Sequence, residues 1–396
     1  MHIIGIDIAK RNHQAVIVDS SGKVVSNAFP FQNSCSGYNK LLDRVRKHSA
    51  HRDQLVFGME ATGHYWLALY TRLKREGYLV HVINPIQPNA LRNLYLRQNK
   101  SDKHDAFLVA EVIRFGQFSQ TTVPQETCHA LRELCRNRFF LVDIASDLKR
   151  KVTALIDQVF PEYDNLFSSN FTETSLALLH RYPTPEVMLR ARMDTLTDLL
   201  YRTSNKRFGK GKAMEVKELA KNTFGVPDPH GVYAHLIRAY ISQLRSLQQE
   251  ISLLDEQIAA LSEQFGSCIT SIPGIGPVLG AVILSEIVDI SRFKSADKLA
   301  AFAGIDPTVR RSGDFIAARN HMSKRGSPYL RRAIWPASTV AVQHDPMFKA
   351  YYEKKAAEGM RYMNIIGHVT KKMASVIFAV LRDGRPYTPH LPQISA

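Results

Sequence analysis

The sequence predicts a mixed α/β domain followed by long helices and a mainly helical C-terminal region. Short β-rich runs bounded by turn residues open the chain, and later strands alternate with a helical pattern. Apolar residues then recur at seven-residue spacing through a long middle segment, as they do in packed helices. We expect four regions, over residues 1–125, 126–262, 263–345 and 346–396, the last being a basic helical tail.

The N-terminal domain is predicted to begin with an antiparallel meander. Its first two β-rich runs are separated by a polar patch, and the turn sequence of residues 19–22 precedes the third run. A later strand leads into a helical pattern and then into a further strand, which together indicate a mixed α/β domain. These strands and the helix are expected at residues 3–8, 14–18, 23–25, 55–59, 65–76 and 79–83.

The middle region is predicted to consist of long helices. Apolar pairs recur every seven residues between Ile237 and Leu261, and a leucine recurs with the same period at Leu134, Leu141, Leu148 and Leu155. Sustained heptads predict a coiled coil, formed either as an antiparallel hairpin within the chain or between chains. An ordinary helical bundle gives similar spacing and is the alternative. Short helices and a basic loop at residues 206–212 separate the two heptad segments.

Composition indicates a globular protein with an anionic partner. The 396 residues include 52 Lys and Arg against 36 Asp and Glu, which gives a formal charge of +16. Such an excess favours binding to a polyanion such as nucleic acid. With 45% hydrophobic and 22% charged residues, the chain is neither disordered nor collagen-like.

Three further features predict a reduced, cytoplasmic protein without zinc. No apolar stretch approaches the ~20 residues of a spanning helix, and Asp7 and Lys10 interrupt what would be a signal-peptide core. The four cysteines are scattered and form no CxxC pair, so we expect no disulfides. The fifteen histidines form neither an HxxxH nor an HExxH pattern, so zinc chemistry is not indicated.

Four carboxylates stand at positions that suggest metal binding. Asp7 lies in an apolar strand and Glu60 ends a later one, whereas Asp102 and Asp105, three residues apart, share one face of a helix. A buried acid is costly unless a cation or hydrogen bonds compensate its charge, although hydrogen bonding alone is an open alternative for Asp7. Hard divalent cations such as Mg²⁺ prefer oxygen ligands, and two of them about 4 Å apart stabilise both oxygens of a phosphodiester displacement.

The segment of residues 309–332 carries seven basic side chains against one acid, Asp314. This density of positive charge is typical of a surface that binds a polyanion. The cations would stabilise a serine alkoxide and the charge on a pentacoordinate phosphorus, so a serine among them is a candidate nucleophile. Ser323 is the first candidate and Ser312 the second, with a cap or turn role as the alternative for each. The basic residues are Arg310, Arg311, Arg319, Lys324, Arg325, Arg331 and Arg332.

The sequence IPGIGPV at residues 272–278 predicts a glycine turn at the start of an apolar helix. A turn at Gly274 and Gly276 would leave backbone N–H groups of the helix free to meet a phosphate. The pattern resembles half of a helix-hairpin-helix, a DNA backbone clamp that reads no base sequence. A plain helix start is the alternative.

These segments together resemble one family of DNA transposases. GIDIAK, GMEATG and KSDKHDA are similar to the DEDD tetrad of the insertion-sequence one-ten group, whose members are related to pilin-gene invertases. IPGIGPV, RFKSADKLAAFAGIDP, RRSGD and HMSKRGSPYLRR are similar, in that order, to the second domain of the same family. The resemblance covers nearly the whole chain.

The resemblance implies an RNase H-like N-terminal domain similar to the RuvC resolvase, a coiled-coil connector and a compact helical transposase domain. It implies that the serine at position Ser323 forms a covalent phosphoserine link to DNA, while Asp7, Glu60, Asp102 and Asp105 bind Mg²⁺. Members of this family act with a structured non-coding guide RNA, the bridge RNA, whose loops pair with donor and target DNA. Because two double-stranded DNAs exchange four strands, we expect a homo-oligomer, either a tetramer or a dimer of dimers.

Other functions are open from the residues alone. A RuvC-type, Mg²⁺-dependent endonuclease would use water as the nucleophile and would form no protein–DNA adduct. A sugar-kinase-like or actin-like ATPase has a related fold, but the chain lacks a second glycine-rich phosphate loop. A coiled-coil nucleic-acid scaffold would not need the four acids.

Overall fold

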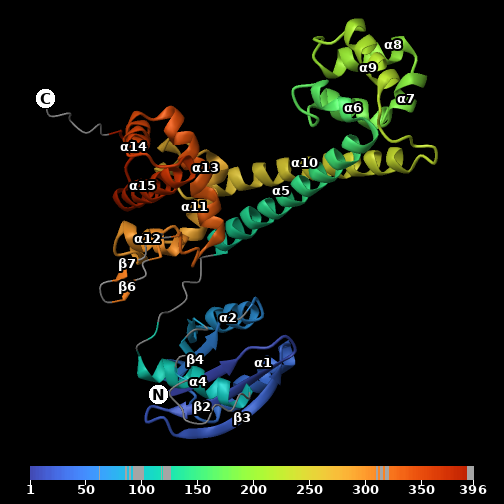
Figure 1. The fold of residues 1–396 in the computed structure, drawn as a ribbon. Coiled ribbons are helices and arrows are strands. Elements are labelled where there is room, and N and C mark those ends of the chain that lie inside the picture. The colour runs from blue at the N-terminus through green and yellow to red at the C-terminus, as the bar shows by residue number, and fades with distance from the viewer. Residues whose placement is uncertain are drawn as a thin grey trace, which may run out of the picture. The chain divides into compact units, whose positions relative to one another are not determined.

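The computed structural model describes residues 1–61, 63–84, 87–88, 91, 102–116, 118, 126–308, 311–312, 315–316 and 321–389. At residues 102–103, 311–312 and 315–316 it describes the backbone alone. The chain divides into two compact units, residues 1–124 and residues 125–396, whose elements are labelled in Figure 1.

The N-terminal unit is built on a five-stranded mixed sheet (Figure 1). Its strands are β1 (His2–Asp7), β2 (Asn12–Asp19), β3 (Val24–Gln32), β4 (Leu55–Glu60) and β5 (Leu79–Ile83). β1, β2 and β3 form an antiparallel meander, and β4 and β5 run parallel to β1, in the spatial order β3-β2-β1-β4-β5. The predicted meander and the two later strands are confirmed, and β3 is longer than expected.

Helices pack on both faces of this sheet. α1 (Cys35–Arg46) and α2 (Trp66–Arg75) bury their apolar residues on one face, and α4 (Asp102–Phe115) buries its own on the other (Figure 1). α2 confirms the predicted helix, whereas α1 was not predicted. The buried apolar residues of α1 follow the spacing of an amphipathic helix at Tyr38, Leu41, Leu42 and Val45.

The backbone of α4 lies directly against β1 at Gly5. A Cβ atom at Gly5 would lie 2.1 Å from the carbonyl oxygen of Ala106 and 2.7 Å from the nitrogen of Ala110. Gly58 is the partner of Gly5 in the β1–β4 register, and a Cβ there would lie 1.9 Å from Cδ1 of Ile113. Two glycines on neighbouring strands therefore let one helix lie close to the sheet.

Two long helices organise the C-terminal unit. α5 (Glu126–Val159) and α10 (Val232–Glu263) pack against each other along their length (Figure 1). Arg138 pairs with Asp255, and near the opposite end of the pair the Tyr233 hydroxyl donates to Oε1 of Gln158 at 3.3 Å. These contacts make the pair antiparallel and intramolecular, which matches the hairpin alternative, whereas a coiled-coil supercoil stays a prediction.

The predicted heptad leucines of α5 flank the helix interface and do not form its centre. They are all only partly buried, whereas the buried positions of α5 are Cys128, Leu131, Cys135, Phe139, Ala145, Val152, Ile156 and Val159. The prediction for α10 is closer, because Ile237, Leu244, Leu254 and Ile258 are buried. All four cysteines of the chain are free thiols, as expected.

A helical subdomain stands between the two long helices in the sequence. It consists of α6 (Glu173–Arg181), α7 (Pro185–Arg190), α8 (Met193–Thr203) and α9 (Lys210–Asn222). Tyr163, Leu196 and Val216 share its core with Ile156 of α5 and Ile241 of α10, so the subdomain packs on one end of the helix pair (Figure 1). The chain also contains short 3-10 helices at Arg52–Gln54, Pro161–Asn165, Cys268–Ser271 and Ile290–Arg292.

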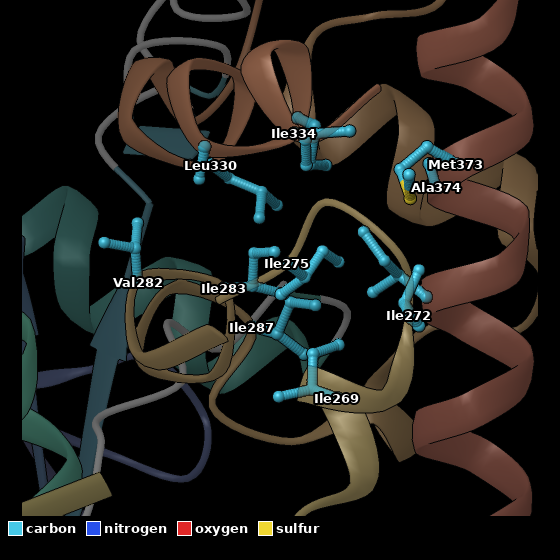
Figure 2. Packing of buried hydrophobic residues seen from close by; sticks show 14 of the residues in the cluster. Ile269, Ile272, Ile275, Val282, Ile283, Ile287, Leu330, Ile334, Met373 and Ala374 are labelled. Atoms are coloured by element: carbon cyan, nitrogen blue, oxygen red, sulfur yellow. The ribbon is translucent and has the colours of Figure 1, made fainter. Parts of the chain in front are cut away.

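The remaining helices form a second core at the other end of the pair. They are α11 (Pro277–Ile287), α12 (Ala296–Ala303), α13 (Pro328–His344), α14 (Pro346–Ala357) and α15 (Tyr362–Asp383), with the two-residue strands β6 (Arg311–Ser312) and β7 (Phe315–Ile316). Figure 2 shows residues of this core, among them Ile283 of α11, Leu330 and Ile334 of α13, and Met373 of α15. All four side chains are fully buried.

α15 belongs to this core although its region was expected to form a tail. Ile366, Thr370, Met373 and Ile377 are each 1% exposed or less. Within the described residues, α15 is also the one helix long and apolar enough to cross a membrane by length and composition, with a mean hydropathy of 1.2. Its packing against α12, α13 and α14 accounts for that apolar character, because a core helix needs the same residues.

We predict that Gly5→Ala destabilises the N-terminal unit by about 1–3 kcal/mol, because the new methyl group meets backbone atoms that cannot rotate away. Gly58→Ala should cost less, since the obstructing atom is the far end of the Ile113 side chain. In a Trp335→Phe background Trp66 is the only tryptophan, so urea denaturation followed by its fluorescence reports on this unit. Equal losses in the two variants would contradict the interpretation.

Candidate functional site

Two predicted acids end neighbouring parallel strands. Asp7 is the last residue of β1 and Glu60 the last of β4, directly after the register pair of Ile6 and Met59. Side chains alternate along a strand, so both carboxylates lie on the sheet face that carries Gly5 and Gly58, the face on which α4 packs.

The start of α4 lies at the same edge of the sheet. At the other end of α4, Arg114 packs beside Gly22, in the turn after β2, and this turn adjoins the first residue of β1 through the pairing of His2 with Asp19. α4 therefore runs antiparallel to β1, and Asp105 in its first turn lies toward the end of β1 that carries Asp7. The backbone of Asp102 begins the helix, and its side chain lies outside the described residues.

These carboxylates provide the donor chemistry that a hard divalent cation prefers. Carboxylate oxygens at one edge of a sheet suit Mg²⁺, because the ion takes only a few protein oxygens and keeps several waters. Among the described side chains, no group of three or more His, Cys, Asp or Glu residues is arranged to hold a metal ion. The four-acid ligand set is therefore still a prediction.

Ser323 lies in a short ribbon of the C-terminal unit. Residues 304–308 and 321–324 run antiparallel, because Ser323 N donates to Asp306 O at 2.8 Å and Thr308 N donates to His321 O at 2.7 Å. Lys324 N adds a bond to Gly304 O at 3.0 Å. The Thr308 hydroxyl also donates to His321 O at 2.9 Å and accepts from His321 N at 3.3 Å.

The side chain of Ser323 is hydrogen-bonded to a carboxylate. Its hydroxyl donates to Oδ1 of Asp306, and the backbone N–H of Arg325 approaches Ser323 Oγ at 3.4 Å. Both Ser323 and Asp306 are partly exposed. Asp306 was not among the predicted site residues. The one signal was its place in AFAGIDP, a segment that resembles the transposase family.

A tight turn follows Ser323. Lys324 adopts the left-handed conformation at φ +52°, and Gly326 has φ +119°. A Cβ at Gly326 would lie 2.2 Å from the carbonyl oxygen of Phe302, so only glycine lets the turn fold back onto the end of α12. Lys324 and Arg325, which directly follow Ser323 in the chain, are exposed at this turn.

A buried carboxylate anchors the chain directly after this turn. The Ser327 hydroxyl accepts from Leu330 N at 3.1 Å, which caps α13, and donates to Glu286 Oε2 at 2.9 Å. Glu286 of α11 is 3% exposed and accepts two bonds from Arg136 of α5, at 2.8 and 3.1 Å. Burial alone would lower the pKa of Arg136, but the hydrogen bond and the charge of Glu286 outweigh it and raise that pKa.

The predicted basic residues divide into exposed and paired side chains. Arg331 donates to the carbonyl oxygen of Ala303 at 3.0 Å. Arg332 forms two bonds to Asp143 at 2.7 and 2.6 Å and lies 4.3 Å above the ring of Phe139. The hydrogen bond from Arg332 lowers the pKa of Asp143. These two arginines join helices of the unit, whereas Lys324 and Arg325 face solvent.

Several predicted residues lie partly or wholly outside the described part of the chain. Arg310 and Arg319 are not described, and Arg311 and Ser312 are described only as the backbone of β6. Their roles stay predictions.

The glycine turn before α11 has a packing role at one of its two glycines. Gly274 has φ +88°, and a Cβ there would lie 2.3 Å from the carbonyl oxygen of Ala337 in α13. Gly276 precedes Pro277 as the N-cap of α11, is exposed and has no atom within 4 Å of its Cβ position. Packing against α13 therefore requires a glycine at position 274. Contact of Gly274 and Gly276 with DNA stays a prediction.

Comparison with known proteins identifies the family. Residues 4–161 match a transposase model of the DEDD type, and residues 266–353 match the model of the transposase IS116/IS110/IS902 family. The chain is 26% identical over 392 residues to the 44.8 kDa protein of insertion element IS116 from Streptomyces clavuligerus, which covers 98% of this chain and 96% of the relative.

A second kind of relative has a named DNA-rearranging activity. The chain is 25% identical over 385 residues to the pilin gene-inverting protein of Moraxella bovis, which covers 97% of both chains. The acidic strand ends fall within the first matched segment and Ser323 within the second. This chain belongs to the IS116/IS110/IS902 family of transposases, enzymes that cut and rejoin DNA.

Proposed function

We propose that this transposase cuts and rejoins donor and target DNA through a covalent phosphoserine at Ser323. The observation that carries the proposal is that Ser323 is partly exposed and is followed in the chain by two exposed basic residues, Lys324 and Arg325. A cation beside the hydroxyl stabilises the charge that develops on the phosphate oxygens during attack. Ser312 is the second candidate, and its side chain lies outside the described residues.

We also propose that the N-terminal unit is RNase H-like and that Asp7, Glu60, Asp102 and Asp105 hold Mg²⁺. The strand order β3-β2-β1-β4-β5 and the acids at the ends of β1 and β4 support this assignment. A DEDD transposase implies a divalent metal, and carboxylates select a hard cation. When bound, the cation would stabilise negative charge on the oxygens of the reacting phosphate.

The partners follow from charge and from the reaction. A formal charge of +16 suits a protein that binds double-stranded DNA together with a structured guide RNA. If base pairing with a bridge RNA selects the DNA sequence, the protein needs mainly backbone and shape contacts. Exchange of four strands requires several copies of Ser323, so we propose a homo-oligomer, a dimer of dimers, acting in the cytoplasm.

We predict that Ser323→Ala lowers formation of the protein–DNA adduct on the order of 10³-fold or more, because no other atom replaces the nucleophile. DNA binding should be nearly unchanged. Denaturing gel electrophoresis of labelled DNA measures the adduct, and Ser312→Ala is the matched comparison. Loss of the adduct in Ser312→Ala but not in Ser323→Ala would identify Ser312 as the nucleophile. Free 5′-phosphates without any adduct would favour the RuvC-type endonuclease.

A second prediction concerns the acids. Asp7→Asn and Glu60→Gln should each lower DNA cleavage by about 10²-fold or more, since each removes an oxygen ligand charge. Chelation with EDTA should have the same effect in the wild type, and added Mg²⁺ should restore cleavage. Asp43→Asn, an exposed acid on α1, is the control and should cleave normally. Full cleavage in EDTA would refute the metal assignment.

The guide RNA generates a third prediction. Removing RNA from the purified protein should abolish recombination between donor and target plasmids, while salt-sensitive, nonspecific DNA binding persists. Adding back the structured RNA encoded beside the gene should restore recombination. Changing one of its loops should redirect the protein to the complementary DNA sequence. Recombination that survives ribonuclease treatment would contradict RNA guidance.

A further inference from the structure

We infer that Asp306 is the general base that accepts the proton of the Ser323 hydroxyl. The inference rests on the proposed role of Ser323 as nucleophile and adds a residue that makes the nucleophile reactive. A serine hydroxyl is a weak nucleophile at neutral pH, and enzymes activate it by placing a base within hydrogen-bond reach.

The contact between the two side chains has the geometry of such a pair. The Ser323 hydroxyl donates a hydrogen bond to Oδ1 of Asp306. The only other hydrogen bond to Ser323 Oγ in the described structure comes from the backbone N–H of Arg325, at 3.4 Å. That N–H is a donor and cannot take the proton. Asp306 is therefore the one acceptor bonded to the hydroxyl within the described part of the chain.

Asp306 differs from two other carboxylates of the same unit in its partners. Among the described residues, no Lys or Arg nitrogen lies within ion-pair distance of the Asp306 carboxylate, although Lys324 and Arg325 neighbour Ser323 in the sequence. By contrast, Asp143 and Glu286 in the same unit are each bonded by an arginine. The carboxylate that accepts the hydrogen bond from Ser323 is thus not bonded by an arginine, unlike those two.

The ribbon does not need this side-chain contact to hold its shape. Backbone bonds join Ser323 to Asp306, Lys324 to Gly304 and Thr308 to His321, and the Thr308 hydroxyl adds two more bonds. Removing the carboxylate would leave all of these in place. A purely structural role therefore predicts little effect of Asp306 substitution on the chemistry, and a basic role predicts a large one.

The proton and bond changes balance in both directions. As Ser323 Oγ forms a bond to phosphorus, its proton passes to Asp306 Oδ1, the bond from phosphorus to the departing sugar oxygen breaks, and that oxygen takes a proton from water. In the joining step a sugar hydroxyl of the new strand attacks the phosphoserine and releases its proton to water. The Ser323 oxygen departs and regains its proton from Asp306, which restores both groups.

The test measures the rate of the Ser323–DNA adduct in a single turnover of the full chain with its RNA, DNA and Mg²⁺. Asp306→Asn keeps the size of the side chain but cannot accept the proton, so the rate should fall about 10²–10⁴-fold. Thr308→Val is the matched control, because it removes side-chain bonds of the same ribbon without touching Ser323, and its rate should stay near that of the wild type.

A second variant separates proton transfer from positioning. Asp306→Ala leaves space beside Ser323, and added sodium formate should restore part of its adduct rate, whereas sodium chloride at the same ionic strength should not. Thermal unfolding of each variant should match the wild type, since the ribbon bonds remain.

The outcomes distinguish this inference from the proposed function. If the wild type forms no adduct at Ser323, the proposed function fails. If the wild type forms the adduct and Asp306→Asn forms it equally fast, the role of Asp306 as base is overturned while the serine mechanism stands. A slow Asp306→Ala variant that unfolds normally and is not rescued by formate likewise overturns proton transfer, and leaves Asp306 as a positioning residue.

Discussion

The direct packing of the α4 backbone on β1 at Gly5 is the constraint on which the acidic edge of the N-terminal unit depends. The contact is possible only because residue 5 has no Cβ, and α4 runs antiparallel to β1 where the two pack. This alignment carries the first turn of α4, with Asp105, toward the strand ends that hold Asp7 and Glu60. A side chain at position 5 would push α4 away from the sheet, so the position of Asp105 relative to Asp7 and Glu60 depends on this glycine.

Glycines also allow close backbone packing around Ser323 in the C-terminal unit. Gly326 allows the turn after Ser323 to lie against the end of α12, and Gly304 brings the opposite strand of the ribbon close enough to pair. Glu286 then fixes the start of α13 through Ser327 and Arg136, a buried interaction in which loss of one partner would leave an uncompensated charge. Contacts with the surrounding helices therefore hold Ser323 and the turn after it in one conformation.

The elements that were predicted correctly are those whose pattern lies within a few neighbouring residues of the sequence. Alternation and turn residues indicate β1, β2 and β3 before any contact is known, and acids at strand ends are visible in the sequence itself. Charge density was a poorer guide. Arg332 was predicted to bind nucleic acid, and that role stays a prediction. Its partner Asp143 lies 189 residues away, so no local pattern reveals this ion pair. The heptad leucines of α5 are a second example. A seven-residue spacing of apolar residues predicts a helix, but it does not determine which of its apolar positions are most deeply buried.

The sequence alone determined the five strands of the N-terminal sheet and their order along the chain, and the excess of positive charge that favours a polyanion. It also offered the four acids and the serine as candidates, since strand patterns and charge can be read from the residues without knowing any contact. Only the tertiary structure decided that Asp306 meets Ser323, that Gly274 is needed for packing against α13, and that α15 completes a core rather than forming a tail. The physical reason is that each of these contacts joins residues brought together by a chain reversal or a helix crossing, whose geometry depends on backbone angles and packing elsewhere in the unit.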